Sequence, residues 1–304
     1  MSKKAKRKVT VKDWISGARL RTLPLAVAPV AVGYGIASVV QAENLTLTLL
    51  ALGVSLSLQI GVNFANDYSD GIRGTDDFRV GPPRLTGSGR VEPKLVRNAA
   101  FASFAVAGTA GLAIVALTGL WWLIAVGAAC VVAAWFYTGG KRPYGYAGLG
   151  EIFVFVFFGL VATFGTAAIQ VPRFFGNADA LIWTSGAAIA VGLFASAVLM
   201  INNIRDIETD ISAGKKTLAV RVGRKWAKGL YLVFLWTPLA LLLPYTLVFQ
   251  HTVFAYLSAF VIVPLSVIVL TAKTAPEYIL ALKLTSYTAL GYALLLTYGL
   301  VVIV

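Results

Sequence analysis

Long apolar segments follow one another along most of this chain, and short polar connections separate them. Each has close to the roughly 20 apolar residues that an α-helix needs to cross the hydrocarbon core of a bilayer. Only 13% of the residues are charged and 58% are hydrophobic, whereas a soluble domain has about 25% charged residues. The sequence therefore predicts an all-α multi-pass membrane protein with nine transmembrane helices, at residues 23–40, 45–66, 97–117, 120–138, 150–170, 180–203, 228–249, 252–271 and 284–304.

Basic side chains gather in every second connection. Eight Lys and Arg precede residue 23, six lie between residues 73 and 97, and seven lie between residues 205 and 228. The odd-numbered connections hold only Arg173. By the positive-inside rule, the N-terminus and the even-numbered connections are expected to be cytoplasmic, and the C-terminus external. The net charge of +13 is thus explained mainly by topology, and nucleic acid is not an expected partner.

The chain before the first apolar segment, residues 1–22, is expected to be a basic cytoplasmic segment, and residues 23–304 to form a single transmembrane domain. Val11, Trp14, Ile15 and Ala18 have helical spacing. A short helix lying in the membrane interface and a disordered lead-in fit this segment equally well.

The first polar break, residues 63–89, holds four aspartates and three arginines directly after an apolar segment. If that segment is helical, Gln59, Asn63, Asn66 and Asp70 form a stripe along one face, which continues into Asp67. Polar side chains are costly in lipid. This face is therefore expected to point into the protein.

A second polar break, residues 203–223, resembles the first. On a continuing helix Asn203, Asp206 and Asp210 share one face, while Glu208 points about 200° away from Asp206. Both breaks follow an even-numbered helix and are four helices apart, which a parallel internal repeat of two four-helix units plus one extra helix would give.

The two breaks hold seven of the thirteen acidic residues, and each also carries Arg or Lys a few residues later. Mg²⁺ commonly takes one or two carboxylates together with phosphate oxygens of a substrate, and basic side chains hold the remaining phosphate oxygens. The pattern indicates two Mg²⁺ ions on a bound diphosphate, and a polyisoprenyl diphosphate would place its tail among the helices. The alternative is that the acids only neutralise basic loops and stay in solvent.

Several long motifs resemble one known family. NDYSD followed by GTDDFRVGPPRLTGSG, together with NNIRDIETDISAGKKTLAVRVG, is similar to the UbiA-type intramembrane prenyltransferase superfamily, in particular its 1,4-dihydroxy-2-naphthoate polyprenyltransferase branch. SGARLRTLPLAVAPV and YTGGKRPYGYAGLGE are also typical of that branch. The wider superfamily has a further aspartate where this chain has Gly74, and Asp76 follows two residues later. This shift, which the branch shares, leaves open whether Asp76 or Asp77 reaches the metal.

The resemblance implies nine helices around a central cavity. It implies that the protein lies in the cell membrane and that the cavity opens to the cytoplasm. It implies transfer of a polyprenyl group from an isoprenyl diphosphate to 1,4-dihydroxy-2-naphthoate, with loss of carbon dioxide and diphosphate, in menaquinone biosynthesis. It assigns the first metal site to Asn66, Asp67 and Asp70, with Asp76 or Asp77 as helper. The second metal site is assigned to Asn203, Asp206 and Asp210.

Candidate diphosphate contacts are basic residues of the cytoplasmic connections, each of which also satisfies the positive-inside rule as a plain loop charge: Arg79, Arg84, Lys141, Lys215 and Arg221.

Four further side chains are candidates for the organic part of the substrates. Tyr137, Tyr144 and Tyr146 are expected to turn a ring toward an allylic cation, or to be interface tyrosines. Glu151 opens an apolar segment and is expected either to orient the aromatic substrate or to lie at the membrane interface.

Two other functions are open to a chain of this kind. One is prenylation of a different aromatic acceptor, which the sequences GPPRL and AGKKTLAVRVG disfavour. The other is transport of an anionic lipid or a metal. The acids lie at helix ends and in loops, with no matching polar pathway to the other side, and this disfavours a transporter.

The alternation of charge predicts which side of the membrane the acidic connections face. In a Cys130→Ala background, Thr75→Cys and Ser212→Cys are expected to react with an impermeant thiol reagent only after the cells are opened, because both connections are predicted to be cytoplasmic. Labelling of either cysteine in intact cells would invert the topology.

Overall fold

The computed structural model describes residues 9–76 and 84–302, and every regular element in these two ranges is helical. The α-helices are α1 Val11–Ala18, α2 Pro24–Val39, α3 Leu45–Ile72, α4 Pro93–Thr118, α5 Leu123–Phe136, α6 Gly150–Val154, α7 Ala162–Ala168, α8 Ala178–Arg205, α9 Ile207–Ser212, α10 Leu218–Leu241, α11 Leu243–Val248, α12 Ala259–Thr271 and α13 Ala275–Val301. Short 3₁₀ turns are η1 Leu20–Thr22, η2 Tyr144–Ala147, η4 Phe174–Gly176 and η5 Gln250–Ser258, and η3 Phe155–Val161 is a π-helix.

All nine predicted apolar segments fall on helices, but the described residues do not give nine full-length spans. Seven helices are long and apolar enough to cross a membrane, and an eighth is added if Val11–Thr22 and Pro24–Val39, bent by 49°, count as one. The remaining segment, α5, has only 14 helical residues. It is shorter than predicted because Gly119 ends α4 in a left-handed conformation (φ 70°) and residues 121 and 122 form a turn.

Several helices extend beyond the apolar segments that predicted them. The helix predicted at 45–66 continues to Ile72, so its acidic end is still helical. The helix predicted to begin at residue 284 begins at Ala275. The chain before residue 228 is also helical from Leu218 onward, but α10 is broken at Gly223, whose backbone is not helical (φ 78°, ψ 160°). Hydropathy marks only the part of a helix that matches the hydrocarbon, whereas capping residues fix where the helix begins. At α13 Thr274 and Glu277 form a capping box.

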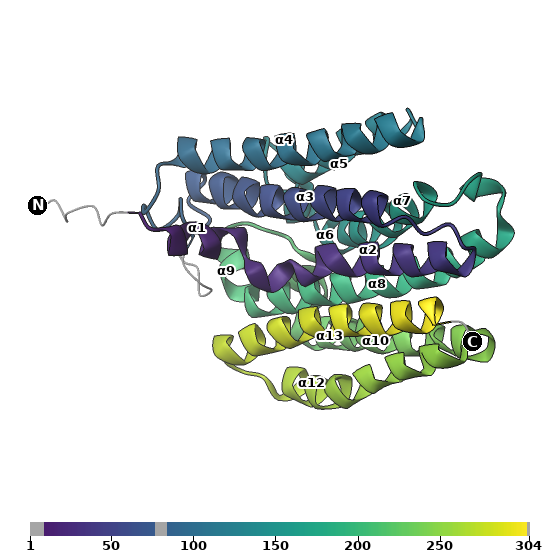
Figure 1. Ribbon diagram of the computed structural model, residues 1–304. Coiled ribbons are helices and arrows are strands. Elements are labelled where there is room, and N and C mark those ends of the chain that lie inside the picture. The colour runs from purple at the N-terminus through teal and green to yellow at the C-terminus, as the bar shows by residue number, and fades with distance from the viewer. Residues whose placement is uncertain (1–8, 77–83, 303–304) are drawn as a thin grey trace, which may run out of the picture.

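The helices lie side by side in one bundle, with α4 and α5 toward one edge and α12 at the other (Figure 1). The helix α8 lies in the middle and packs against α10, α13, α2 and η3. Its sequence is rich in alanine, and small residues let neighbouring helices approach closely without a hydrophobic driving force. The helix α1 and the C-terminal end of α13 lie toward opposite ends of the bundle, and α9 lies at the same end as α1 (Figure 1).

Residues 11–18 form the helix α1, so the disordered lead-in is wrong for these residues. The helix α1 packs on α3, where the Trp14 ring meets the Phe64 ring edge-on at 5.7 Å between centroids. Val11 and Ile15 remain exposed, and this surface suits a membrane interface.

The segment predicted as one helix at 150–170 contains the π-helix η3. Its Gly159 meets Gly192 of α8 so closely that a Cβ on Gly159 would stand 2.5 Å from the Gly192 Cα. Backbone cannot yield as a flexible side chain can, so this contact requires glycine.

The close contact makes Gly159→Ala destabilising. We expect an unfolding free energy lower by about 1–3 kcal/mol, as for other overpacked contacts, seen as a lower Tm of the detergent-solubilised protein. The matched control is Gly229→Ala on α10, where a Cβ would meet nothing within 4 Å and helix propensity predicts a gain of up to about 1 kcal/mol. Equal Tm values for the two variants would contradict the packing argument.

Candidate active site

A cavity of about 800 Å³ enters the bundle between its two acidic helix ends. Its walls come from α3, α4, α5, η3, α7 and α8 and are mostly apolar, with side chains such as Leu58, Val62, Val115, Val131, Phe157 and Val198. Polar side chains concentrate at one end of it. The cavity therefore suits a molecule with a long apolar part and a charged head.

The predicted polar stripe of α3 forms one wall of the cavity. Gln59, Asn63, Asn66 and Asp70 are all buried and all line it, which confirms that this face points into the protein. Gln59 donates to the Thr22 hydroxyl at 2.9 Å, and the Thr138 hydroxyl donates to Asn66 at 2.8 Å. The stripe is thus held by hydrogen bonds to neighbouring segments and does not depend on lipid.

Asp70 is the centre of the polar end. It is 3% exposed, and its Oδ2 lies 3.5 Å from Arg84 Nη2 and 3.6 Å from Lys215 Nζ. The Tyr146 hydroxyl donates to Asp70 Oδ1. Burial, followed by the charge of Asp70, raises the pKa of the Tyr146 hydroxyl, so Tyr146 stays protonated and acts as a donor. The Lys215 ammonium also lies 4.5 Å from the Tyr146 ring centre.

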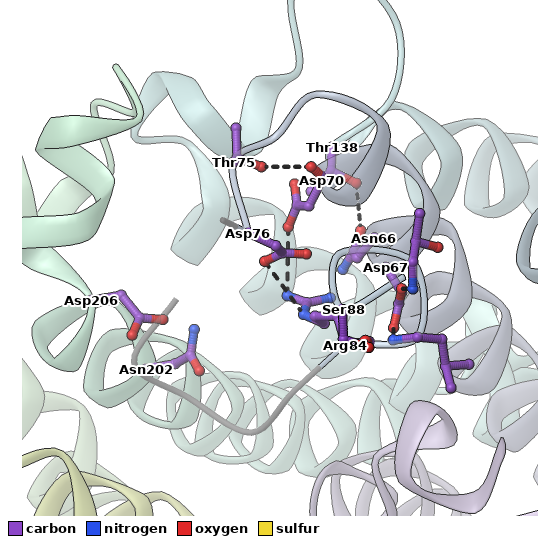
Figure 2. A network of polar contacts seen from close by, with 12 residues as sticks. Asn66, Asp67, Asp70, Thr75, Asp76, Arg84, Ser88, Thr138, Asn202 and Asp206 are labelled. Atoms are coloured by element: carbon purple, nitrogen blue, oxygen red, sulfur yellow. Dashed lines mark hydrogen bonds and ion pairs between the residues drawn. The ribbon is translucent and has the colours of Figure 1, made fainter. Parts of the chain in front are cut away.

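A turn after α3 brings Asp76, the aspartate that follows Gly74 in the first motif, close to Asp70 and Arg84. The helix α3 ends at Ile72, and Gly74 adopts φ 73°, a left-handed conformation that favours glycine. This turn brings Asp76 back to Arg84, with 3.8 Å between Asp76 Oδ1 and Arg84 Nε. Asp70, Asp76 and Arg84 point toward one another (Figure 2). Asp77 lies outside the described residues, as does Arg79.

The second polar break forms the facing wall. Asn202, Asn203, Asp206 and Asp210 all line the cavity. The helix does not continue without interruption as predicted: α8 ends at Arg205, and α9 begins after Asp206. One i to i+4 hydrogen bond, from the Asp210 N–H to the Asp206 carbonyl at 2.8 Å, still keeps both carboxylates on the cavity side.

Asp206 is paired within its own segment. Arg205 donates from Nε and Nη2 to the two carboxylate oxygens of Asp206 at 2.7 and 2.5 Å. Figure 2 shows Asn202 and Asp206 across from Asp76 and Arg84. Glu208 lies elsewhere, as its position on the helix predicted: it is exposed, and its contact with Arg224 (2.5 Å) lowers the pKa of the Glu208 carboxyl.

Two predicted diphosphate contacts lie away from the cavity. Lys141 is exposed and does not line it. Arg221 donates to the carbonyls of Lys216 and Ala147 at 3.1 and 3.0 Å, so it ties the η2 turn to the start of α10. Arg84 and Lys215 are the candidate cations that the structure brings to the described part of the site.

The structure separates two candidates for the organic part of the substrates, Glu151 and Tyr137, by their position relative to the cavity. Glu151 is buried but does not line the cavity, and it accepts a hydrogen bond from Asn203 at 2.9 Å. It is therefore placed to orient Asn203. Tyr137 lines the cavity and meets the Tyr144 ring at 5.4 Å, and Tyr144 stacks on Phe153 at 4.0 Å.

Asp67, which was predicted to be a metal ligand, does not line the cavity. Its carboxylate is 1% exposed and accepts hydrogen bonds from the N–H groups of Leu85 and Thr86, both at 2.8 Å. The helical period alone does not show this, because at 100° per residue Asp67 stands only about 40° from Asn63 and about 60° from Asp70.

Asn202 and Arg73 are not among the site residues predicted from the sequence. Asn202 lines the cavity beside Asp206. Arg73 donates to the carbonyls of Thr138 and Gly140, and its guanidinium lies 5.5 Å from the Tyr146 ring centre. Nothing in the local sequence pairs Arg73 with carbonyls some 65 residues away.

The carboxylates are spread over two walls and do not form a ready-made metal cage. Within residues 9–76 and 84–302, no three His, Cys, Asp or Glu side chains converge closely enough to hold a metal ion by themselves. This donor set fits Mg²⁺, which takes one or two carboxylates and completes its shell with water and substrate phosphate oxygens. It does not fit a structural zinc site, which needs four protein ligands.

Comparison with known proteins agrees with this architecture. The model of the UbiA prenyltransferase family matches residues 26–279. The 1,4-dihydroxy-2-naphthoate octaprenyltransferase of Mycobacterium tuberculosis is 53% identical over 220 residues, 72% of this chain and 73% of that protein. The Haemophilus influenzae protein of the same name is 37% identical over 277 residues, 82% of this chain and 87% of that protein.

The fold is shared with solved structures at much lower identity. A UbiA homolog from Archaeoglobus fulgidus, solved bound to GPP and Mg²⁺, gives a TM-score of 0.65 at 15% identity, covering 96% of this chain and 100% of that one. The family match extends over more than half of the chain, and relatives above 30% identity cover more than two thirds of it. The chain therefore belongs to the UbiA prenyltransferase family.

Proposed function

We propose that the protein transfers a polyprenyl group from an isoprenyl diphosphate to 1,4-dihydroxy-2-naphthoate, releasing carbon dioxide and diphosphate and forming demethylmenaquinone. Family membership and the shared name of relatives at 37% and 53% identity support this assignment. The protein is an integral membrane enzyme of menaquinone biosynthesis.

One observation carries the proposal. The mostly apolar cavity of about 800 Å³ ends between Asp70 and Asp76 on one wall and Asp206 and Asp210 on the other, with Arg84 and Lys215 beside Asp70. The apolar walls suit an isoprenoid chain, and the mixed charges suit its metal-bound diphosphate. A solvated acidic loop would have no reason to bury these groups beside a cavity.

Two Mg²⁺ ions are the proposed cofactor, and a UbiA homolog from Archaeoglobus fulgidus has been solved with Mg²⁺ and GPP. Asp70 and Asp76 would hold one ion and Asp206 and Asp210 the other, with amide oxygens of Asn66 and Asn203 nearby. When bound, such ions neutralise the charge that develops on the departing diphosphate. Asp67 is left out of this set because it does not line the cavity and its oxygens accept the N–H groups of Leu85 and Thr86.

The chain's own residues supply binding, orientation and shielding. Arg84 and Lys215 donate charge-assisted hydrogen bonds to phosphate oxygens, and Tyr146 adds a neutral donor. The rings of Tyr137, Tyr144 and Phe153 form an aromatic cluster on the cavity wall, with Tyr137 edge-on to Tyr144 and Tyr144 stacked on Phe153, and such rings favour an allylic cation. Apolar walls keep water from the cation until the electron-rich naphthoate ring attacks it.

The membrane orientation belongs to the same proposal. The chain crosses the cell membrane nine times, with α5 as a short ninth crossing, and the N-terminus and the mouth of the cavity face the cytoplasm. The charge alternation supports this orientation. The opposite positions of α1 and the C-terminal end of α13 in the bundle agree with an odd number of crossings (Figure 1).

Removing a cavity-lining acid should abolish most turnover. Asp70→Ala, Asp206→Ala and Asp210→Ala are each expected to lower kcat/KM at least about a hundredfold, because stabilisation of the departing diphosphate supplies several kcal/mol. Product formation from a radiolabelled isoprenyl diphosphate measures this. Glu208→Ala is the matched control, since Glu208 is exposed and outside the cavity, and a loss as large as that of Asp206→Ala would refute the assignment.

The identity of the acceptor has its own signature. With carboxyl-labelled 1,4-dihydroxy-2-naphthoate, labelled carbon dioxide should appear in step with prenylated product, and only when Mg²⁺ or a similar ion is present. When the prenyl group adds to the carboxyl-bearing ring carbon, that carbon is no longer aromatic. The carboxyl group must then leave as carbon dioxide for the ring to regain its aromatic quinol form. A product that retains the label would exclude this acceptor chemistry and favour a prenyltransferase that keeps its acceptor's carboxylate.

A further inference from the structure

The one acid of the first motif that does not line the cavity holds a loop in place. Asp67 accepts the N–H groups of Leu85 and Thr86, which are adjacent residues of the Arg84 loop, defined here as residues 84–91. We propose that Asp67 is a positioning residue: its buried carboxylate fixes this loop on α3 and so holds the Arg84 guanidinium over the diphosphate site. The inference rests on the proposed function, because it assigns Arg84 to the diphosphate.

Both oxygens of Asp67 face the Arg84 loop and not the cavity. Each of its two oxygens accepts one backbone N–H at 2.8 Å, and the side chain is 1% exposed. A buried carboxylate needs such partners, and bonds from N–H groups to an ionised acceptor are stronger than those between neutral groups. Figure 2 shows Asp67 turned away from Asp70 and Asp76 and toward the loop.

Two glycines allow the loop to approach α3 this closely. A Cβ on Gly71 would stand 2.4 Å from Thr86 Cγ2 and 2.9 Å from the backbone nitrogen of Gly87. A Cβ on Gly87 would stand 2.6 Å from the Cβ of Asp76. The loop therefore lies against both the last turn of α3 and the chain that carries Asp76, and no side chain fits between them.

The loop is also held from its other side. The helix α1 covers Leu85, which is buried, and a Cβ on Gly17 would stand 2.6 Å from Leu85 Cδ1. Asp13 of α1 pairs with Arg90 at 3.3 Å. Within the loop, the N–H groups of Arg90 and Val91 both bond to the Leu85 carbonyl at 3.1 Å. Leu85 is thus the fixed point of the loop.

Arg84 is the residue directly before that fixed point. Its side chain is only 9% exposed and reaches Asp70 at 3.5 Å and Asp76 at 3.8 Å. An arginine on a free loop would sample many positions, whereas fixing the next two amides fixes the point on the backbone from which the Arg84 side chain extends before the substrate arrives. The effect of Asp67 is therefore expected on diphosphate binding, transmitted through Arg84, and not on the metal.

The test replaces Asp67 by Asn, which keeps the size but leaves one acceptor oxygen for two N–H groups. We expect Asp67→Asn to weaken binding of farnesyl thiodiphosphate, a slowly reacting analogue, about tenfold, and to leave the Mg²⁺ activation constant within about twofold of wild type. The Leu85 and Thr86 amides should exchange hydrogen faster in the variant, which needs no substrate to measure.

A double-mutant cycle separates positioning from an independent role. In an Arg84→Met background, Asp67→Asn should weaken analogue binding less than about twofold further, because its effect passes through Arg84. If Asp67→Asn does not fold, Gly71→Ala provides a second route, since the added methyl displaces Thr86 while Asp67 stays intact; it should weaken analogue binding in the same way. Asp179→Asn, on the exposed first turn of α8, is the matched control and should change nothing.

The outcomes distinguish this inference from the proposed function. An Asp67→Asn variant whose Mg²⁺ activation constant rises as much as that of Asp70→Asn would make Asp67 a metal ligand and overturn the positioning role. Unchanged exchange at Leu85 and Thr86, or additive effects in the cycle, would overturn it as well. A wild-type protein that binds the analogue but forms no prenylated naphthoate would instead remove the proposed function, and the binding and exchange results would still decide the role of Asp67.

Discussion

The polar end of the cavity depends on one buried carboxylate, that of Asp70. An isolated charge at 3% exposure would be strongly unfavourable, so it must be paired. Its partners come from three segments far apart in sequence: Arg84 from the loop after α3, Tyr146 from η2, and Lys215 from the turn after α9. The pairing of Asp70 therefore also decides where three connections lie relative to one another, and with them the mouth of the cavity.

Much of this could be predicted from sequence because two simple constraints act on a membrane chain. The apolar segments locate the helices, since lipid requires about 20 apolar residues for each span. The period of the helix places Gln59, Asn63, Asn66 and Asp70 on one face, and the price of polar groups in lipid turns that face inward. Both constraints are local in sequence, which is why they can be read without coordinates.

What could not be predicted depends on contacts between distant segments. Lys215 and Arg221 are basic residues of the same connection, and only the path of the chain after α9 shows that one reaches Asp70 while the other binds carbonyls. Similarly, composition cannot tell that α5 is a short helix or that residues 155–161 form a π-helix. The role of Asp67 also depends on such contacts: the helical period places Asp67 next to the stripe, and its partners Leu85 and Thr86 come from a loop without a recognisable pattern.

The pairing of acids with bases has a consequence for the order of events under the proposed function. Asp70 is paired with Arg84 and Lys215, Asp76 with Arg84, and Asp206 with Arg205. A metal ion alone would have to compete with these bases for the carboxylates, and a diphosphate alone would have to compete with the carboxylates for the bases. A metal-bound diphosphate supplies a metal ion for the carboxylate and a phosphate oxygen for the base. Each ion pair that is broken is therefore replaced by two new ones. The site therefore favours the combination over either component, and it keeps its charges paired within the apolar bundle before the substrate arrives.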